Sequence, residues 1–322
     1  KTGVSSDEGG RFMLTDIPAG TYVLRITHIG FSELVLADVS VDGESEVELV
    51  MSDEVIFIDQ SVVSASRRQE KILDAPASVS VIDAEDIRTQ PVSTVAEHIR
   101  DLPAVDFAQT GLAQANVVAR GFNNIFSGAM LTLTDNRIAR VPSLRLNAYN
   151  FIPVTNDDIE RIELVLGPGS ALYGPNSANG VMHIITRSPL DRQGTNVNVG
   201  LGERSVRRFS ARHAGKIGEN LGYKLSLQSF SGTDWEYVDP EEIELRDYDL
   251  SRNSTELRID YRPNDDLMAI VSTGYNSADN IELTGLGAGL ADGWVSGYYQ
   301  ARVMYKDLFF QAFQNWTDAG DT

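Results

Sequence analysis

The chain has 322 residues, a formal net charge of −19 and no cysteine. This acidic balance argues against nucleic-acid binding, which requires clustered lysine and arginine, and the lack of cysteine excludes disulfides and thiolate metal sites. The length suits two or three domains. No run of about 18 apolar residues occurs, so no transmembrane helix is expected, although alternating barrel strands would escape such a search.

Residues 1–52 are predicted to form a small β-sandwich. Segments 10–17, 20–30 and 45–51 alternate apolar and polar residues and are separated by turn residues. The side chains expected to face inward are Phe12, Leu14, Tyr22, Leu24 and Ile26. The stretch 7–31, DEGGRFMLTDIPAGTYVLRITHIGF, resembles the carboxypeptidase regulatory-like domain, which implies a transthyretin-like fold without catalysis.

Residues 53–77 mix extended and charged residues, and no partner strand of obvious register follows them. We expect a flexible connector that contains a β-prone stretch. The chain opens without a start methionine or a signal peptide, and it looks like an internal piece of a longer protein.

Residues 78–188 are predicted to form an α+β domain. Its helix should lie within 93–103, because Thr94 and Glu97 have capping-box spacing and Pro103 closes the segment. The long irregular section 139–158 is expected to be functional or docked against another part. Strands are expected at 78–82, 116–122 and 130–138, and in both arms of a hairpin within 161–189.

That hairpin, RIELVLGPGSALYGPNSANGVMHIITRSP, is rich in glycine, which raises the possibility of a phosphate-binding loop. Gly169 and Gly174 have the spacing of a P-loop, but Pro175 and Asn176 stand where lysine and a hydroxyl residue are required. Proline also lacks the N–H group that such a loop uses. Nucleotide binding is therefore not expected.

Residues 189–322 contain seven candidate strands of alternating polarity. They lie at 195–202, 207–214, 223–230, 255–262, 267–275, 296–305 and 307–316. In the fourth, Leu257, Ile259 and Tyr261 form one face and charged residues form the other. Brief turns alternate with the long connections 233–253 and 276–293, and aromatic residues fall near strand ends, as in an outer-membrane barrel. A water-soluble β-sandwich would show the same alternation, so that alternative stays open.

No catalytic or metal-binding group is expected. The histidines His28, His98, His183 and His213 lack paired spacing, and we expect each on the surface of a strand or helix. Segment 234–249 holds eight carboxylates and one base, Arg246, and could gather calcium, although a solvated loop is the simpler interpretation. No Ser/His/Asp group can be argued. We therefore expect a protein that is not an enzyme and has no cofactor.

In this order the segments resemble a TonB-dependent outer-membrane receptor. The stretch 73–87, LDAPASVSVIDAEDI, is similar to the opening of the family's plug domain, Arg120–Phe122 to its Arg-Gly-Phe strand, and 159–189 to its closing hairpin. The resemblance implies a mostly β fold: the small β-sandwich (1–52), the connector (53–77), an α+β plug domain (78–188) and the first strands of an antiparallel transmembrane β-barrel (189–322). A barrel of about 22 strands would continue through roughly fifteen more.

The resemblance also implies a TonB box, which the partner protein TonB binds as an added edge strand through main-chain hydrogen bonds. Segment 59–66, DQSVVSAS, resembles this box. Its expected residues are Asp59, Gln60, Ser61, Val62, Val63 and Ser64. Two alternatives are open: VVSAS is a permanently paired first strand of the plug domain, or the box is EVIFIDQ (54–60) just upstream.

In this family the arginine of Arg-Gly-Phe pairs with glutamates on the barrel, which predicts a plug–barrel lock at Arg120. A second arginine usually precedes the Gly-Pro of the hairpin, but Leu166 stands there and puts that half of the lock in doubt. The usual Asp-Gly turn is Asp135-Asn136, a modest change because asparagine tolerates left-handed backbone. The glycines assigned to tight turns of the hairpin are Gly167, Gly169, Gly174 and Gly180.

The function implied is import of a scarce solute across the outer membrane of a Gram-negative bacterium, energised by TonB, its inner-membrane partners and the proton-motive force. Ferric siderophores are the commonest ligands of the family, and oligosaccharides and cobalamin are alternatives. Other partners would be outer-membrane lipids, and nucleic acid is not expected. Solute binding would expose the TonB box. The plug side chains expected to face the solute are Asn123, Asn124, Phe126, Arg145, Asn147 and Tyr149.

Two rival functions differ from import. A surface adhesin or docking protein would share the barrel but would not need a TonB box. A soluble multidomain β-protein is the second rival. Deleting residues 59–66 would separate the first rival from a transporter, because only a transporter would lose uptake while still binding its ligand.

Overall fold

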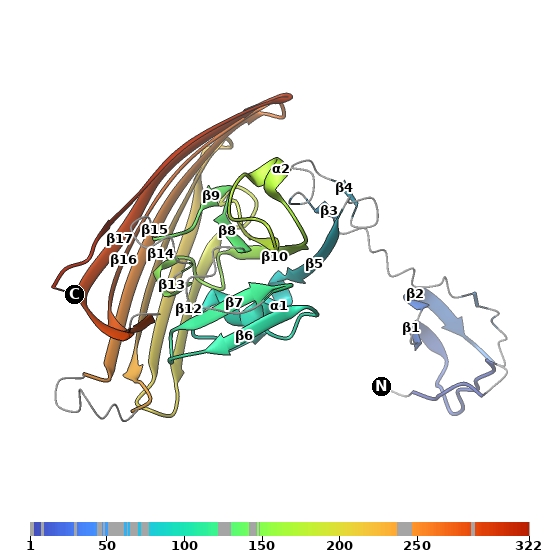
Figure 1. Cartoon of the computed structure of the whole chain (residues 1–322). Helices are drawn as coiled ribbons and strands as arrows, with labels where there is room; N and C mark the ends of the chain where they lie inside the picture. Colours follow the sequence, from blue (N-terminus) through green and yellow to red (C-terminus); the bar gives the residue numbers. More distant parts are fainter. Residues whose placement is uncertain are drawn as a thin grey trace. The chain divides into compact units, whose positions relative to one another are not determined.

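The computed structural model falls into two units, residues 1–60 and 61–322 (Figure 1). None of the described helices is long and apolar enough to cross a membrane. The residues that the structure describes are 3–7, 10–28, 31–43, 47, 49–50, 61–62, 64, 70–71, 77–121, 130–141, 147, 149–236, 247–284 and 287–321.

The described residues of the first unit contain one antiparallel hairpin. β1 (Gly20–His28) pairs with β2 (Phe31–Val41), and β1 confirms the strand expected at 20–30. The strand expected at 10–17 is wrong, because no ladder forms there. Most of segment 45–51 lies outside the described residues.

Two of the side chains expected to face inward in this unit are exposed. Phe12 and Tyr22 are 39% and 38% exposed, whereas Leu14, Leu24 and Ile26 are half-buried. The expectation is wrong for the first two because the described part of the unit is a single two-stranded layer, which leaves one face of the hairpin uncovered.

The predicted plug domain is built on a five-stranded mixed sheet. In spatial order its strands are β5 (Ser78–Asp83), β10 (Ile159–Leu166), β11 (Gly180–Thr186), β8 (Met130–Thr134) and β9 (Arg137–Ile138). β10 is antiparallel to β5 and β11, and β11 is parallel to β8. One face buries Ile162, Leu164 and Met182 in the main apolar core. Glu163 and His183, paired across β10 and β11, lie on the opposite face.

Short helices and a second hairpin cover the main apolar face. They are α1 (Ala84–Thr89), the 3₁₀ helices η2 (Val95–Ile99) and η3 (Tyr149–Phe151), and the strand pair β6 (Val105–Gln109) and β7 (Ala115–Ala119). The capping box of Thr94 and Glu97 is confirmed, but the helix it starts is 3₁₀ and ends at Ile99. α1 was not predicted, because it has only six residues; the Asp83 carboxylate caps it by accepting from two backbone amides at 2.8 and 3.0 Å.

The glycine-rich connection between β10 and β11 is a compact turn that holds α2 (Ser170–Tyr173). Gly167 has a φ of 124°, which side-chain-bearing residues rarely adopt, and its N–H donates to the Asn179 carbonyl at 3.0 Å. A Cβ atom on Gly180 would lie 2.5 Å from the Val165 carbonyl oxygen. Two of these glycines are therefore required by backbone geometry. Of the four glycines assigned to tight turns of the hairpin, Gly167, Gly169 and Gly174 lie in this connection, and Gly180 is the first residue of β11.

The remainder of the second unit is a seven-stranded antiparallel sheet, here called the wall, which lies along one side of the plug domain (Figure 1). All seven predicted strands are confirmed, and each neighbours the next in sequence. The prediction of a long loop at 276–293 is wrong, because two long strands pair through most of this segment. The strands are β12 (Gly194–Leu201), β13 (Arg207–Ile217), β14 (Leu221–Thr233), β15 (Asp249–Asn264), β16 (Leu267–Thr284), β17 (Gly287–Tyr305) and β18 (Leu308–Asp318).

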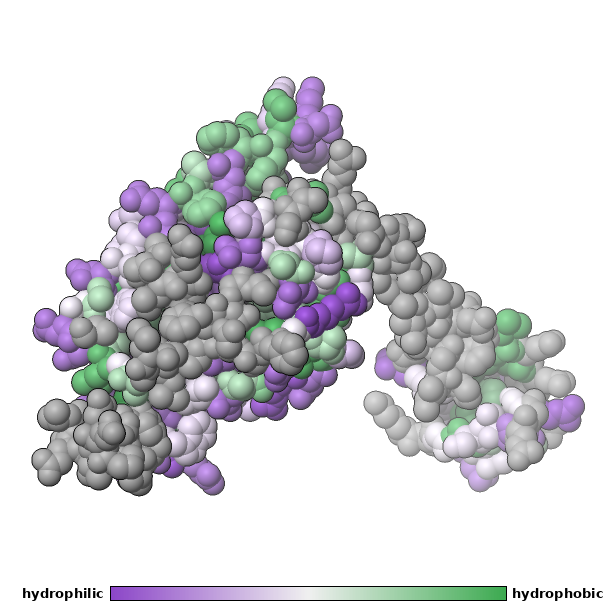
Figure 2. Space-filling model, in the orientation of Figure 1, coloured by the Kyte–Doolittle hydropathy of each residue, from purple (hydrophilic) through white to green (hydrophobic). Residues whose placement is uncertain are grey.

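The wall buries its polar face and exposes its apolar one. In β15, Leu257, Ile259 and Tyr261 are 41%, 39% and 44% exposed. The residues between them, Glu256, Arg258 and Asp260, are 2%, 3% and 0% exposed. A soluble sandwich would bury the apolar face, so that alternative is wrong and the polarity is that of a membrane barrel. Hydrophobic side chains are visible over the upper ends of the long wall strands (Figure 2).

Candidate functional site

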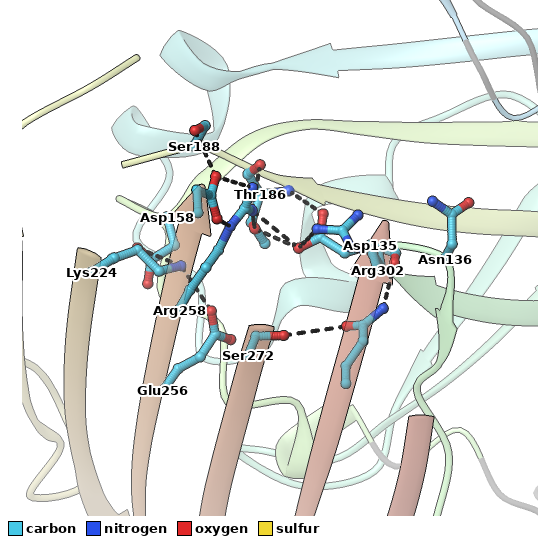
Figure 3. Close-up of polar contacts among 12 residues, drawn as sticks. Asp135, Asn136, Asp158, Thr186, Ser188, Lys224, Glu256, Arg258, Ser272 and Arg302 are labelled. Atoms are coloured by element: carbon cyan, nitrogen blue, oxygen red, sulfur yellow. Dashed lines mark hydrogen bonds and ion pairs between the residues drawn. The ribbon is translucent and has the colours of Figure 1, made fainter. Parts of the chain in front are cut away.

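The candidate site is the seam between the plug domain and the polar face of the wall. Charged side chains from both sides converge there in two clusters (Figure 3). Buried polar residues of the wall line this seam; they include Ser210, Arg212, Lys224, Gln228, Arg252, Glu256, Arg258, Asp260, Asn276, Gln300 and Arg302.

The first cluster, the Asp135 junction, is centred on the turn between β8 and β9. Asp135 and Asn136 have positive φ values of 48° and 67°, as in a type I′ hairpin turn. The Asp135 carboxylate accepts hydrogen bonds from the Thr186 amide at 3.1 Å and from its hydroxyl at 2.6 Å. Two wall guanidiniums, of Arg258 and Arg302, lie 3.4 and 3.5 Å from the same carboxylate.

Further contacts fix this junction to the wall. Asp260 holds the Arg258 guanidinium through two hydrogen bonds of 2.7 and 2.8 Å, and it accepts from the Ser188 hydroxyl at 2.6 Å. The side-chain amide of Gln300 donates to the Asp135 carbonyl at 2.8 Å, and that of Gln311 donates to the Asn136 carbonyl at 3.0 Å. The turn is therefore held by its backbone as well as by its charge.

The second cluster, the Asp158 junction, lies just before β10. The Asp158 carboxylate is 2.9 Å from the Arg212 guanidinium and 3.1 Å from the Lys224 ammonium. Lys224 is fully buried and also contacts Glu256 of the neighbouring strand at 2.7 Å. Thr155 donates its hydroxyl hydrogen to the second oxygen of Asp158 at 2.9 Å.

Charge pairing keeps both plug carboxylates ionised. Burial alone would raise the pKa of Asp135, but the Arg302 and Arg258 guanidiniums outweigh it and hold that pKa well below its usual range. Burial opposes ionisation of Asp158 as well, and Lys224, Ser226 and Arg212 together lower its pKa. Such pairs add little net stability over an apolar contact, because desolvation offsets the attraction, but removing one partner is costly.

The seam also contains contacts that are not ion pairs. Glu282 of β16 accepts from the amides of Gln114 and Asn150, both of the plug domain, the second at 2.8 Å. The rings of Phe151 and Trp294 pack at 5.6 Å between centroids.

Part of the connector docks on the face of the plug sheet opposite the main core. Ser64 is fully buried, and its backbone N–H donates to Glu163 Oε2 at 2.8 Å. Its hydroxyl lies 2.8 Å from Nδ1 of His183, and its carbonyl accepts from the Tyr173 hydroxyl at 2.6 Å. These four residues are called the connector clamp. Nearby, β3 (Ser61–Val62) pairs with β4 (Glu70–Lys71).

The other expected TonB-box residues, Asp59, Gln60 and Val63, lie outside the described residues. Arg120 is exposed, and its guanidinium lies beside the Gly167 turn. Within the described part of the chain no ion pair of Arg120 is found. Leu166, which replaces the expected second arginine, is 7% exposed and belongs to the main core.

Of the side chains expected to face a solute, Asn123, Asn124, Phe126 and Arg145 lie outside the described residues. Asn147 is half-buried and donates to the Met130 carbonyl at 2.7 Å. Tyr149 is 3% exposed and packs in the main core, where burial raises its pKa to about 12.

The expectation of surface histidines is wrong for two of the four. His98 is 5% exposed and contacts the side chains of Gln90 and Asn156, and His183 is 1% exposed in the connector clamp. Both lie where polar partners replace water, which alternation in the sequence does not reveal. His213 is exposed, and the side chain of His28 lies outside the described residues. Among the described residues no group of three or more potential metal ligands is found.

Sequence reasoning missed most of the seam. Alternation in β15 predicted one charged face with Glu256, Arg258 and Asp260, and these three residues do lie together on the buried face of the wall. It did not identify Asp158, Lys224 or the connector clamp, because each depends on partners more than 30 residues away. A lysine in the middle of an otherwise alternating strand is the one local sign that could have drawn attention to Lys224.

Residues 71–181 match the family model described as TonB-dependent Receptor Plug Domain. Over 205 residues the chain is 30% identical to the vitamin B12 transporter BtuB of Vibrio vulnificus, covering 61% of this chain and 32% of that protein. Over 167 residues it is 33% identical to the protein of that name from Vibrio cholerae, covering 52% of this chain and 27% of the other. The chain thus spans about a third of the length of these relatives.

Solved structures share the fold at low identity. The alcaligin outer membrane receptor FauA of Bordetella pertussis gives a TM-score of 0.61 at 16% identity, over 80% of this chain and 41% of the other. The ferric enterobactin receptor PfeA of Pseudomonas aeruginosa gives a TM-score of 0.56 at 19% identity, over 75% of this chain and 41% of the other. The similarity includes both the plug domain and the wall.

Proposed function

Because this chain belongs to the TonB-dependent outer-membrane receptors, we propose that it takes part in active import of a scarce solute across the outer membrane of a Gram-negative bacterium. The observation that carries the proposal is the polarity of the wall, which is apolar outside and charged toward the plug domain. A plug held by charged and hydrogen-bonding groups can move without exposing a large apolar surface, because water can replace each of those contacts. Such a seam suits a plug that must rearrange during each cycle.

Residues 59–64 are proposed as the TonB box. TonB would bind this segment and, with its inner-membrane partners and the proton-motive force, would supply the energy for import. The clamp at Ser64 supports this assignment, because it would hold the end of the segment while no solute is bound. TonB would capture the released backbone as an added edge strand. Arg120 is proposed to lock the plug domain to the barrel through a carboxylate outside the described residues.

Two solute classes have separate support. Ferric siderophores are proposed first, since solved structures of similar fold include the ferric enterobactin receptor. Cobalamin is the second candidate, because the curated relatives with about 30% identity are named vitamin B12 transporters. Plug segments 121–130 and 140–148 are proposed to meet the solute in either case; the expectation is wrong for Tyr149, which is buried in the core.

Uptake by cells that express the whole protein tests the proposal. Cells that lack their own receptors would be given radiolabelled ferric enterobactin or cyanocobalamin, with and without deletion of residues 59–66. We expect uptake of one solute, and loss of that uptake with unchanged surface binding in the deletion variant. A control deletion of the same length in the first unit, residues 10–17, should leave uptake intact.

Unchanged uptake after deletion of 59–66 would exclude an energised box at this position. Binding without any uptake, in the undeleted protein, would favour the rival surface-binding function. Uptake of neither solute, combined with growth on an oligosaccharide, would assign the third solute class.

A further inference from the structure

Both ring nitrogens of His183 are engaged, each by a different part of the chain. Nδ1 lies 2.8 Å from the Ser64 hydroxyl in the connector clamp. Nε2 accepts a hydrogen bond from the Asn136 backbone N–H at 3.1 Å. Because the backbone amide can only donate, Nε2 must be unprotonated, and in a neutral ring Nδ1 then carries the hydrogen.

This arrangement fixes the direction of a chain of hydrogen bonds. The Asn136 amide donates to His183, whose Nδ1–H donates to the Ser64 hydroxyl. The Ser64 hydroxyl in turn interacts with Glu163, which also accepts the Ser64 backbone N–H at 2.8 Å. The Asn136 amide selects the tautomer in which Nδ1 carries the hydrogen, because Nε2 can accept only while it is unprotonated.

The first donor belongs to the turn that the wall holds. Gln300 and Gln311 bind the two carbonyls of Asp135 and Asn136, and two guanidiniums bind the Asp135 carboxylate. The last acceptor in the chain, the Glu163 carboxylate, instead binds the connector at Ser64. His183 therefore stands between the seam on one side and the connector on the other.

We propose that His183 is a positioning residue that couples docking of the connector at Ser64 to the seating of the Asp135–Asn136 turn against the wall. When the turn leaves the wall, the imidazole is no longer held in the tautomer whose Nδ1–H donates to the buried Ser64 hydroxyl. The clamp then weakens and the connector is released. This inference rests on the proposed function, in which a released connector is what TonB binds.

A thiol placed in β3 would report connector release. The 322 residues contain no cysteine, so Ser61→Cys gives a single reactive site once any cysteine elsewhere in the whole protein is replaced by serine; it is labelled by a maleimide in liposomes. We expect labelling to be about tenfold faster in His183→Phe, whose ring has no nitrogen to form either hydrogen bond, than in the background protein. His213→Phe is the matched control, because His213 is exposed on β13 and should leave the rate unchanged.

A double-mutant cycle tests the coupling itself. Gln311→Ala removes one neutral contact to the Asn136 carbonyl and should speed labelling about threefold. In the His183→Phe background the same change should have no further effect. An equal acceleration in both backgrounds, or none in either, would overturn the proposal. His183→Gln, whose amide offers one donor and one acceptor, should restore slow labelling, and failure to do so would also count against it.

The pH profile separates this role from a purely structural one. Burial lowers the pKa of His183 from 6.5 to about 4, although Glu163 and Asp135 favour the charged ring and Arg302 and Arg161 oppose it. A pKa lowered in the docked state means that docking is favoured above pH 6.5 and lost as the pH falls toward 4. Labelling should therefore rise up to about tenfold between pH 7 and 5.5, relative to a cysteine at exposed Asp307, and should stay flat in His183→Gln.

The two proposals fail in different ways. If the labelling rate is the same with and without His183, the coupling proposal is wrong and the import proposal is unaffected. If uptake is unchanged after deletion of residues 59–66, the proposed TonB-energised import is wrong, whatever the labelling rates are.

Discussion

The core of the plug domain and its seam with the wall are equally buried but chemically opposite. In the core, Ile162, Leu164 and Met182 are fully buried among other apolar side chains. In the seam, Lys224 and Asp158 are buried to the same degree as ions. An apolar core holds its shape because opening it exposes apolar surface, whereas an ionic seam holds its register because each charge needs a specific partner.

This difference shows how one domain can be both stable and movable. The core keeps the plug sheet intact, and the seam sets where the sheet sits. Opening the seam to water costs less than the burial of its charges suggests, since the ions regain hydration. The predictions below break or sharpen this contrast, from the largest expected effect to the smallest.

Lys224→Met should have the largest effect. It leaves Asp158 and Glu256 buried next to each other without the ammonium between them. Removing one partner of a buried pair costs about 3–5 kcal/mol. Urea titration followed by tryptophan fluorescence would report it, because Trp294 lies in the seam. Lys216→Met, an exposed lysine on β13, is the control and should change stability by less than about 0.5 kcal/mol.

Leu164→Ala should cost about 2–5 kcal/mol through a cavity in the core. Unlike the seam, this loss should not depend on pH between 3 and 7, because the titratable side chain in the core cluster, Tyr149, has a pKa of about 12. Repeating the urea titration of this variant at several pH values would check it. A loss that varied with pH would mean that core and seam do not behave as separate regions.

Acid should open the seam without opening the core. The pKa values of Asp135 and Asp158 are lowered in the folded protein, so their contribution is present above the usual value of about 4 and is lost as the pH falls below it. Each unit of that shift corresponds to about 1.4 kcal/mol. In a variant that keeps Trp294 as its one tryptophan, the fluorescence should change below pH 4 before the circular dichroism signal of the β-structure is lost. In Asp135→Asn the fluorescence change should be smaller.

Arg262→Gln should have the smallest effect. Arg262 and Asp191 form a two-bonded ion pair of 2.9 and 3.0 Å, but the side chains are 35% and 61% exposed. Exposed pairs contribute less than about 1 kcal/mol and are screened by salt. The same urea titration at low and high salt would test this. A loss comparable to that of Lys224→Met would show that burial does not separate the two kinds of pair.

The sequence allowed much of the fold to be predicted. Period-two alternation located all seven wall strands, because the polarity of a strand repeats over its whole length. The capping box located the start of η2, since that signal is local. Strand ends were placed less well: β16 continues to Thr284 and β17 begins at Gly287, within a segment whose glycine and polar residues are typical of a loop. Which face of the wall is buried could not be told from alternation alone.

The candidate site was far less predictable. Asp135 was noticed as part of a turn, but its partners Arg258 and Arg302 lie more than 100 residues further along the chain. His183 was expected at the surface, because a histidine in an apolar strand carries no local sign of its contacts with Ser64 and Asn136. Such long-range pairs are set by strand register and packing, which only the folded chain determines.

The two junctions also have an electrical consequence. Four cations of the wall, Arg212, Lys224, Arg258 and Arg302, face two carboxylates of the plug domain and two of the wall itself, Glu256 and Asp260. Any movement that withdraws Asp135 and Asp158 leaves the wall with an excess of two positive charges at this place. A hydrated passage lined in this way attracts anions and repels cations. The contacts that seat the plug domain would thus become, once it moves, a charge filter along the path it opens.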